Sequence, residues 1–311
     1  MRRMREPKEF SSFDRQIEII CEKIAIRDKD EAKEALKKIG YFQLMGGYKS
    51  LFRIPGTKKY KEGTSFEEIV SLYEFDVELR ELFFRYLLQI ERNLRSLMSY
   101  YFTETYGAAQ KEYLNPQNYD LAKKNQYTVE RLIATLERAA NTQDYAYINY
   151  YREQYGDIPL WVLSNVLTFG NLSKMFRVFP QSLKSKVSKN FAPLNPHQME
   201  QFLSVLTKYR NVFAHGERLF TYKTVDAIAD TPIHQELAIE KSGNQYKYGK
   251  QDLFAVVIAF YYLLPEKDFS CFSQNLLKII QTVSGQLIHV EERELLEKMG
   301  FPQNWGKLIL I

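Results

Sequence analysis

The segment between Tyr209 and Phe220 contains the residue types needed to cleave RNA without a metal ion. Arg210 and Asn211 are followed three residues later by His215, and Arg218 lies just beyond. An imidazole can move a proton near neutral pH, and a guanidinium can bind a phosphate through two parallel hydrogen bonds. RNA supplies its own nucleophile, the ribose 2′-hydroxyl, so such a site needs only proton transfer and stabilisation of charge. Arg210, Asn211 and His215 are therefore candidate catalytic residues that would need no metal or cofactor. Arg218 is a candidate second phosphate ligand, with a surface ion pair as the alternative.

The spacing of these residues is moderately specific. A chain of this composition contains the pattern Arg-Asn-x3-His by chance roughly 0.03 times. The pattern leaves two interpretations open. In the first, the segment is a catalytic site. In the second, it is the end of a helix, and His215 forms a structural hydrogen bond.

A helix over residues 196–215 would position this segment. Apolar residues recur in it at helical spacing, and Gly216 directly follows His215, as is typical of a helix C-cap. Asn211 and His215 are then one helical step apart on one face, with Arg210 on the flank of that face.

Several other chemistries are excluded. The sequence has no Gly-rich phosphate loop of the Gly-Lys-Ser/Thr type, no Gly-x-Gly-x-x-Gly and no Gly-x-Ser-x-Gly. The four histidines include no pair at i, i+4, so a His-rich zinc site has little support. Two cysteines are too few for a disulfide framework and fit a reducing compartment.

Positive charge is concentrated in two segments of a chain whose net charge is +5. Residues 1–62 hold 16 basic and 10 acidic residues, and residues 171–190 hold five basic residues, Lys174 and Arg177 among them, and no acid. Such segments favour contact with a polyanion, because cations that bind phosphates release counterions. A solvated helix face is the alternative interpretation.

Aromatic and basic residues alternate in the loop-rich stretch 40–64. This mixture suits RNA, whose bases stack on rings while its phosphates contact cations. We predict RNA contact by Tyr48, Lys49 and Arg53, whereas Tyr41 and Phe42 could instead attach the loop to the core. The same stretch contains Lys58, Lys59 and Lys61.

The hydrophobic pattern predicts a mainly α-helical chain with a basic N-terminal helical module (1–64) and a helical domain (65–311). The longest helical pattern begins at a capping box, Ser65-x-x-Glu68, and ends before Gly107, and its length suggests a break near Phe75–Val77. Further helices are expected at about 122–141, 144–154, 160–168, 171–178, 180–190, 251–264, 267–283 and 286–298. A short β-hairpin is expected within 235–248.

Structural roles are expected for three other features. The pairs Asp76–Arg80 and Glu91–Arg95 have i, i+4 spacing, so ordinary helical ion pairs are expected, and a role for Glu91 in orienting active-site groups is the alternative. Trp161 is expected in the core.

No signal peptide or membrane span is expected. The charged N-terminus has no apolar stretch behind it, and the longest apolar run, residues 253–264, has 12 residues. These features indicate a soluble protein of the cytoplasm.

Several blocks of sequence resemble known families. Arg210-Asn211-x3-His215 resembles the signature of HEPN ribonucleases, a helical superfamily that includes toxin ribonucleases. Over about residues 12–222 the chain also resembles the Abi family, abortive infection bacteriophage resistance proteins of the AbiD/AbiF type. The blocks that carry this second resemblance occur in the family's order, and they are Ile39-Gly-Tyr-Phe42, Gly47-Tyr48, Leu72-Tyr-Glu-Phe-Asp76-x2-Leu-Arg80, Ile90-Glu-Arg-Asn-Leu-Arg95, Trp161 with Leu167-Thr-Phe-Gly170-Asn-Leu-Ser-Lys174, and Arg210-Asn-x3-His-x2-Arg218-Leu-Phe220.

These resemblances imply a bacterial, toxin-like antiviral defence protein with a HEPN-like helical bundle. They also imply that Arg210 and His215 are the catalytic pair of a ribonuclease, that a homodimer forms the active site, and that a structured non-coding RNA acts as partner and regulator. The alternative is a non-catalytic RNA-binding module in which the Arg-Asn-x3-His segment is structural.

Overall fold

The computed structural model describes residues 9–191 and 193–309, and it is mainly α-helical, as predicted. The first eight residues, which belong to the predicted basic module and to the expected signal-free N-terminus, lie outside the described residues. Within the described ranges, no helix combines the length and the apolar character needed to cross a bilayer.

The elements follow one another along the chain, with longer connections at 47–65 and 216–231. The α-helices are α1 (Phe13–Cys21), α2 (Lys29–Ile39), α3 (Phe66–Tyr106), α4 (Gln110–Leu114), α5 (Gln126–Ala140), α6 (Ala146–Tyr155), α7 (Leu160–Leu163), α8 (Phe169–Val178), α9 (Gln181–Ser188), α10 (Pro196–His215), α11 (Pro232–Glu236), α12 (Leu253–Leu263), α13 (Glu266–Gln286) and α14 (Glu292–Met299). A π-helical turn (η1, Phe42–Gly46) and 3-10 turns (η2, Pro116–Asn118; η3, Ser164–Val166; η4, Trp305–Ile309) complete the helical part.

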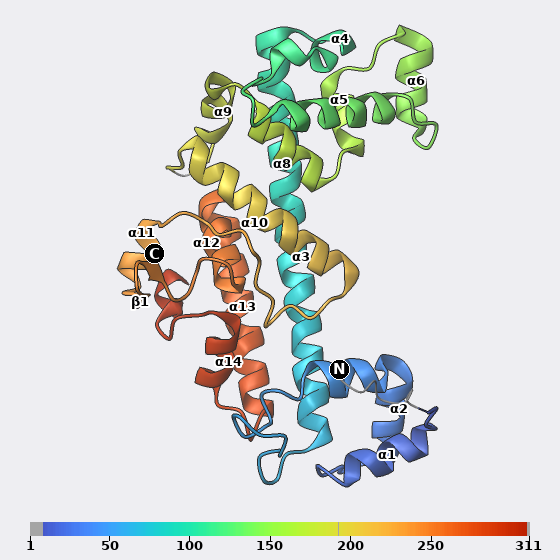
Figure 1. Cartoon of the computed structure of the whole chain (residues 1–311), viewed down its shortest axis with the longest axis vertical. Helices are drawn as coiled ribbons and strands as arrows, with labels where there is room; N and C mark the ends of the chain where they lie inside the picture. Colours follow the sequence, from blue (N-terminus) through green and yellow to red (C-terminus); the bar gives the residue numbers. More distant parts are fainter. Residues whose placement is uncertain (1–8, 192, 310–311) are drawn as a thin grey trace, which may run out of the picture.

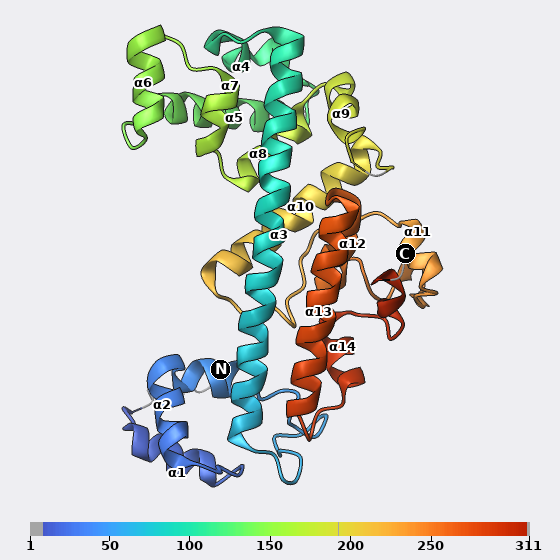
Figure 2. The same cartoon turned by 180° about the vertical axis from the view of Figure 1, so that it is seen from behind.

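Helix α3 runs through the whole length of the molecule (Figures 1 and 2). It begins at the predicted capping box, in which the Ser65 hydroxyl accepts from the Glu68 amide and the Glu68 carboxylate accepts from the Ser65 amide. The predicted break near Phe75–Val77 is wrong, because α3 is one helix of 41 residues. It contains no Pro or Gly, and α13, α10, α9, α7 and α8 are among the elements that pack on it, so tertiary packing stabilises the unbroken helix.

The core is built where α10, α12 and α13 pack on α3. Helix α12 is apolar on all sides and almost completely buried. The Phe83 ring of α3 lies 5.0 Å from Phe272, 5.7 Å from Phe260 and 6.1 Å from Phe213, measured between ring centroids. These aromatic contacts fix α10 against α3 and thereby the position of the α10 C-terminus.

The helices flanking α3 lie on two sides of it. Helices α12 to α14 and the hairpin lie on one side. On the other side, the α5–α6 region projects at one end of α3 and α1–α2 at the opposite end, and the C-terminal end of α10 lies between them (Figures 1 and 2).

The predicted hairpin is confirmed but short. Strands β1 (Lys241–Ser242) and β2 (Gln245–Tyr246) pair antiparallel, with Lys241 opposite Tyr246.

The His234 ring, near the hairpin, is buried between Thr231 and the Gly249 carbonyl, and burial lowers the pKa of this histidine. His234 therefore has a structural role in this region.

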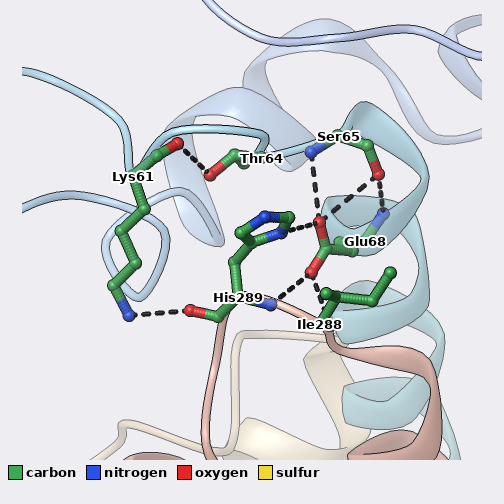
Figure 3. Close-up of polar contacts among 6 residues, drawn as sticks. All are labelled: Lys61, Thr64, Ser65, Glu68, Ile288 and His289. Atoms are coloured by element: carbon green, nitrogen blue, oxygen red, sulfur yellow. Dashed lines mark hydrogen bonds and ion pairs between the residues drawn. The ribbon is translucent and has the colours of Figure 1, made fainter.

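Glu68 ties the start of α3 to the segment before α14 (Figure 3). Its carboxylate accepts from the backbone amides of Ile288 (2.8 Å) and His289 (2.9 Å) and lies 2.8 Å from the His289 Nδ1 atom. Lys61 donates to the His289 carbonyl (2.9 Å) and to Glu294 (2.7 Å). Lys61, a member of the basic loop, is thus engaged inside the protein.

Replacing Glu68 by glutamine is expected to lower the free energy of unfolding at pH 7 by about 2 kcal/mol. Burial alone raises the pKa of Glu68, but the hydrogen bonds from His289 and Ser65 outweigh it, so the pKa is lowered. A lowered pKa adds stability at pH values above the unfolded-state pKa of about 4.3. This stability disappears as the pH falls through the folded-state pKa. Urea unfolding between pH 3 and 7 should show the difference from wild type shrinking in acid, whereas Glu74→Gln, at an exposed position of α3, should match wild type throughout.

Candidate active site at the end of helix α10

Helix α10 spans the predicted residues and ends at His215. Asn195 and Gln198 form a capping box at its start, with Pro196 in the first turn, and Gly216 adopts a left-handed conformation (φ 65°) at its end. Eight apolar or aromatic side chains along the helix are buried, and Tyr209 holds its position by donating to the Tyr222 carbonyl (2.9 Å). The predicted C-cap is confirmed, so His215 lies in the last helical turn.

His215 and Asn211 are exposed on one face of α10. Neither side chain has a hydrogen bond or ion pair within residues 9–191 and 193–309. By contrast, His234 is buried with two ring contacts and His289 is bound by Glu68. The second interpretation of the segment required a structural hydrogen bond from His215, and the described residues contain none.

Arg210 lies half-buried on the flank of α10, toward α3. Its guanidinium carbon is 5.9 Å from the centroid of the Phe84 ring, and its buried Nε atom has no hydrogen-bond partner among the described residues. Arg210 and His215 are five residues apart, which separates them by about 140° around the helix and places their Cα atoms about 9 Å apart. An arginine side chain can cover much of that distance, and no carboxylate among the described residues neutralises it.

The backbone that follows His215 is held by a buried carboxylate, Asp76 of α3. Asp76 accepts from the amides of Leu219 (3.1 Å) and Phe220 (2.7 Å) and from the Tyr48 hydroxyl (2.8 Å). It also pairs with Arg80 at 2.5 Å. Burial raises the pKa of the Asp76 carboxyl, while Arg80 and the two amides oppose that rise.

Arg80 completes this anchor by donating to the Glu217 carbonyl (3.2 Å). The predicted i, i+4 ion pair therefore exists, but it is buried and fixes the segment after the candidate site instead of stabilising a solvated helix face. Sequence reasoning missed this role. The available signal was that Asp76, Arg80 and Tyr48 all lie in the blocks that carried the family resemblance.

Tyr48 is 2% exposed, and its ring stacks on Phe220 with centroids 5.7 Å apart. The ring offers no free face to a base, so the structure assigns Tyr48 to the core and not to an RNA-binding surface. Its neighbour in the sequence pattern, Phe42, is instead 83% exposed.

Lys49, Arg53 and Arg218, all predicted to bind RNA, line one pocket of about 330 Å³. The Arg218 guanidinium donates to the Gly47 carbonyl, which brings together positions 171 residues apart in the chain. We call this cavity the loop pocket, and the full set of its lining residues is Gly46, Gly47, Lys49, Ser50, Arg53, Ile54, Pro55, Gly56, Thr57 and Arg218.

Lys174 and Arg177 line a second pocket, of about 310 Å³, between α8 and α10. Lys208 of α10 joins them there, seven residues or about 10 Å before His215 along the helix. Two carboxylates also line this pocket; Arg177 lies 3.6 Å from that of Glu200, and Ser204 donates to that of Asp226. Of the other cations in the basic segment, Lys184 pairs with Glu200 and Lys186 with Glu104.

The predicted Glu91–Arg95 ion pair is confirmed, whereas the predicted burial of Trp161 is not. Glu91 and Arg95 form the predicted ion pair (2.8 Å), but it is largely buried, and Arg95 also donates to the Leu167 carbonyl (3.3 Å). The pair therefore links α3 to the turn before α8. Trp161 is 46% exposed, so its predicted place in the core is wrong. Helix α7 is only one turn long and buries its other side, which leaves the indole at the surface.

Comparison with known proteins gives one match. No curated protein and no solved structure matches the chain. A family model described as Abi-like protein matches residues 34–221, which is more than half of the chain. The matched range begins within α2, contains the residues that anchor and form the candidate site, and ends just after Phe220. The chain therefore belongs to the family of Abi-like proteins.

Proposed function

We propose that this Abi-like protein acts in abortive infection, a form of defence against phage, as a metal-independent endoribonuclease of the HEPN type. Family membership supports the defence role. The observation that carries the enzymatic proposal is His215, exposed at the end of α10 without a partner among the described residues and flanked by Arg210 and Arg218.

The proposed reaction is a transesterification within the RNA strand. The ribose 2′-oxygen attacks the adjacent phosphorus as it loses its proton, and the bond from phosphorus to the 5′-oxygen of the next nucleotide breaks. The leaving oxygen takes up a proton, and the products are a 2′,3′-cyclic phosphate and a 5′-hydroxyl. His215 transfers one of these protons, and Arg210 stabilises the negative charge that develops on the phosphate oxygens.

The two proton transfers occur on opposite sides of the phosphorus, and each chain offers one Arg-Asn-x3-His segment. We propose that a homodimer brings two His215 side chains to one scissile phosphate. The exposed end of α10 is compatible with such a contact. Sedimentation equilibrium over a range of concentrations tests this, and a mass of one chain throughout would count against it.

The proposal also includes an RNA partner. Basic residues line two pockets, the loop pocket with Arg218 and the pocket of Lys174, Arg177 and Lys208, and both pockets include a residue within ten positions of His215 in the chain. These surfaces suit both an RNA substrate and a structured non-coding RNA that regulates activity. Action on host or phage RNA would take place in the cytoplasm.

Cleavage is expected to depend on a single 2′-hydroxyl. The assay uses a single-stranded RNA with EDTA present. A matched RNA carries one 2′-deoxy nucleotide at the mapped cleavage position, and an all-DNA strand serves as a further control. We expect 2′,3′-cyclic phosphate ends from the first substrate, at least ~100-fold slower cleavage at the deoxy position in the second, and none in the third.

Two outcomes would contradict the enzymatic proposal. Cleavage of the deoxy-substituted position at the full rate would exclude 2′-hydroxyl attack. Strong, salt-dependent RNA binding without product, equal in wild type and His215→Ala, would favour the non-catalytic RNA-binding module.

A further inference from the structure

We propose that the loop pocket binds one phosphate of single-stranded RNA next to the cleavage site, and that the Phe42 ring at its rim stacks on the adjoining base. This inference rests on the proposed endoribonuclease function, because it places a substrate strand at the end of α10. It adds a second recognition point and a class of substrate segment, an unpaired nucleotide.

The described residues that line the pocket carry charge of one sign. Its three ionisable members, Lys49, Arg53 and Arg218, are cations, and none of the lining residues within 9–191 and 193–309 is a carboxylate. The pocket between α8 and α10, by comparison, contains the carboxylates of Glu200 and Asp226. A small concave site with several cations and no acid suits a phosphate, whose oxygens accept several hydrogen bonds at once.

The loop that forms one wall is held in shape before any ligand binds. The amide of Ile54 donates to the Lys59 carbonyl (3.0 Å), and the amide of Lys61 donates to the Phe52 carbonyl (2.8 Å). Between them, the Arg53 guanidinium carbon lies 5.2 Å from the centroid of the Tyr60 ring. The buried Arg53 Nε atom has no hydrogen-bond partner among the described residues.

The opposite wall of the loop pocket is formed by Arg218, which follows His215 in the chain. Arg218 donates to the Gly47 carbonyl, and the next two residues, Leu219 and Phe220, are bound by Asp76. Because both walls are ordered in advance, a phosphate bound here loses little affinity to the ordering of protein groups.

Phe42 supplies the surface for a base. It is 83% exposed, although it is a large apolar ring. A β-carbon at position 46 would lie 3.5 Å from this ring, so the ring rests on the backbone of Gly46, which itself lines the pocket. The ring is in contact with the pocket wall and remains accessible, as in aromatic platforms for unpaired bases.

Distance links the pocket to the proposed chemistry. Arg218 is three residues after His215, so their Cα atoms are at most about 11 Å apart. One RNA strand can therefore reach the imidazole and the loop pocket with neighbouring nucleotides.

The test measures RNA affinity in the His215→Ala background, in which cleavage is expected to be about 10³-fold slower. Fluorescence anisotropy with a labelled single-stranded RNA decamer, at several salt concentrations, compares Lys49→Ala, Arg53→Ala and Phe42→Ala. Lys267→Ala is the matched control, because Lys267 is an exposed cation of α13, a helix that lies on the other side of α3 from the C-terminal end of α10 (Figure 1). Thermal melting checks that each variant is folded.

Each cation variant is expected to bind RNA roughly tenfold more weakly. For the loss of one phosphate contact, the slope of log affinity against log salt should also fall by roughly 0.7. Phe42→Ala should weaken binding about tenfold without changing the slope, because stacking releases no counterions. A second decamer carries one uncharged methylphosphonate linkage at the contacted position. The protein with an unchanged loop pocket should bind this decamer more weakly than the ordinary one. Lys49→Ala should not weaken the binding of the methylphosphonate decamer further.

Equal affinities and slopes for the pocket variants and Lys267→Ala would overturn the proposal. A second experiment titrates the protein with inorganic phosphate and with a mononucleotide by calorimetry. If Lys49→Ala abolishes the binding of these small ligands but leaves RNA affinity unchanged, the pocket binds a free nucleotide, and the proposal is also overturned. The two proposals fail separately. If the wild-type protein binds RNA through the pocket but does not cleave it, only the endoribonuclease proposal is wrong. If the wild-type protein cleaves RNA and the pocket substitutions change neither RNA affinity nor cleavage, only the pocket proposal is wrong.

Discussion

Replacing His215 by alanine is expected to slow RNA cleavage by about 10³-fold, the size of a general acid–base contribution. The stability of the protein should not change, because the imidazole is exposed and makes no hydrogen bond or ion pair with the described residues. Single-turnover cleavage of one labelled RNA, together with thermal melting of both proteins, measures the two quantities.

His197→Ala is the matched control for this prediction. His197 is also exposed, and it lies in the first turn of the same helix, far from the C-terminal end. We expect its cleavage rate to equal that of wild type. If His215→Ala cleaves as fast as His197→Ala, His215 is not the proton-transfer group.

Replacing Asp76 by alanine is expected to destabilise the protein by about 3–5 kcal/mol, because it leaves a buried partner charge uncompensated. Arg80 loses its ion pair, and the amides of Leu219 and Phe220 lose their acceptor. Since these amides fix the backbone just after His215, RNA cleavage should fall as well, even under conditions in which the variant remains folded. Urea unfolding and cleavage at low temperature measure the two effects.

Glu78→Ala controls for the loss of a carboxylate from the same helix, since Glu78 is exposed on α3. Its effect should stay within about 0.5 kcal/mol. The double variant Asp76→Leu with Arg80→Met should recover part of the lost stability, because it removes both buried charges together. If Asp76→Ala is as stable as Glu78→Ala, the anchor contributes nothing to the fold.

Features that depend on neighbouring residues could be predicted from the sequence. Helix α10 and its cap at Gly216 follow from local signals, apolar residues at helical spacing and a glycine directly after His215. The same reasoning located the start of α3 at Ser65 and the hairpin within 235–248. The ordered blocks that include Arg210 and His215 were also sufficient to indicate the family, which the family model confirms.

Only the tertiary structure decided how distant segments meet. Spacing predicted the Asp76–Arg80 pair, but its burial depends on a backbone segment more than 140 residues away, which supplies the amides of Leu219 and Phe220. The unbroken course of α3 likewise depends on the elements packed along it, and no local pattern encodes them.

The difference in exposure between Tyr48 and Phe42 has the same origin. Both are aromatic residues in one basic loop, and composition does not distinguish them. Packing against Phe220 buries Tyr48, whereas Phe42 is left 83% exposed. Sequence periodicity and capping are local and determine the helices, but burial and the meeting of Arg218 with the 46–57 loop are properties of the packed chain, so only the fold could decide them.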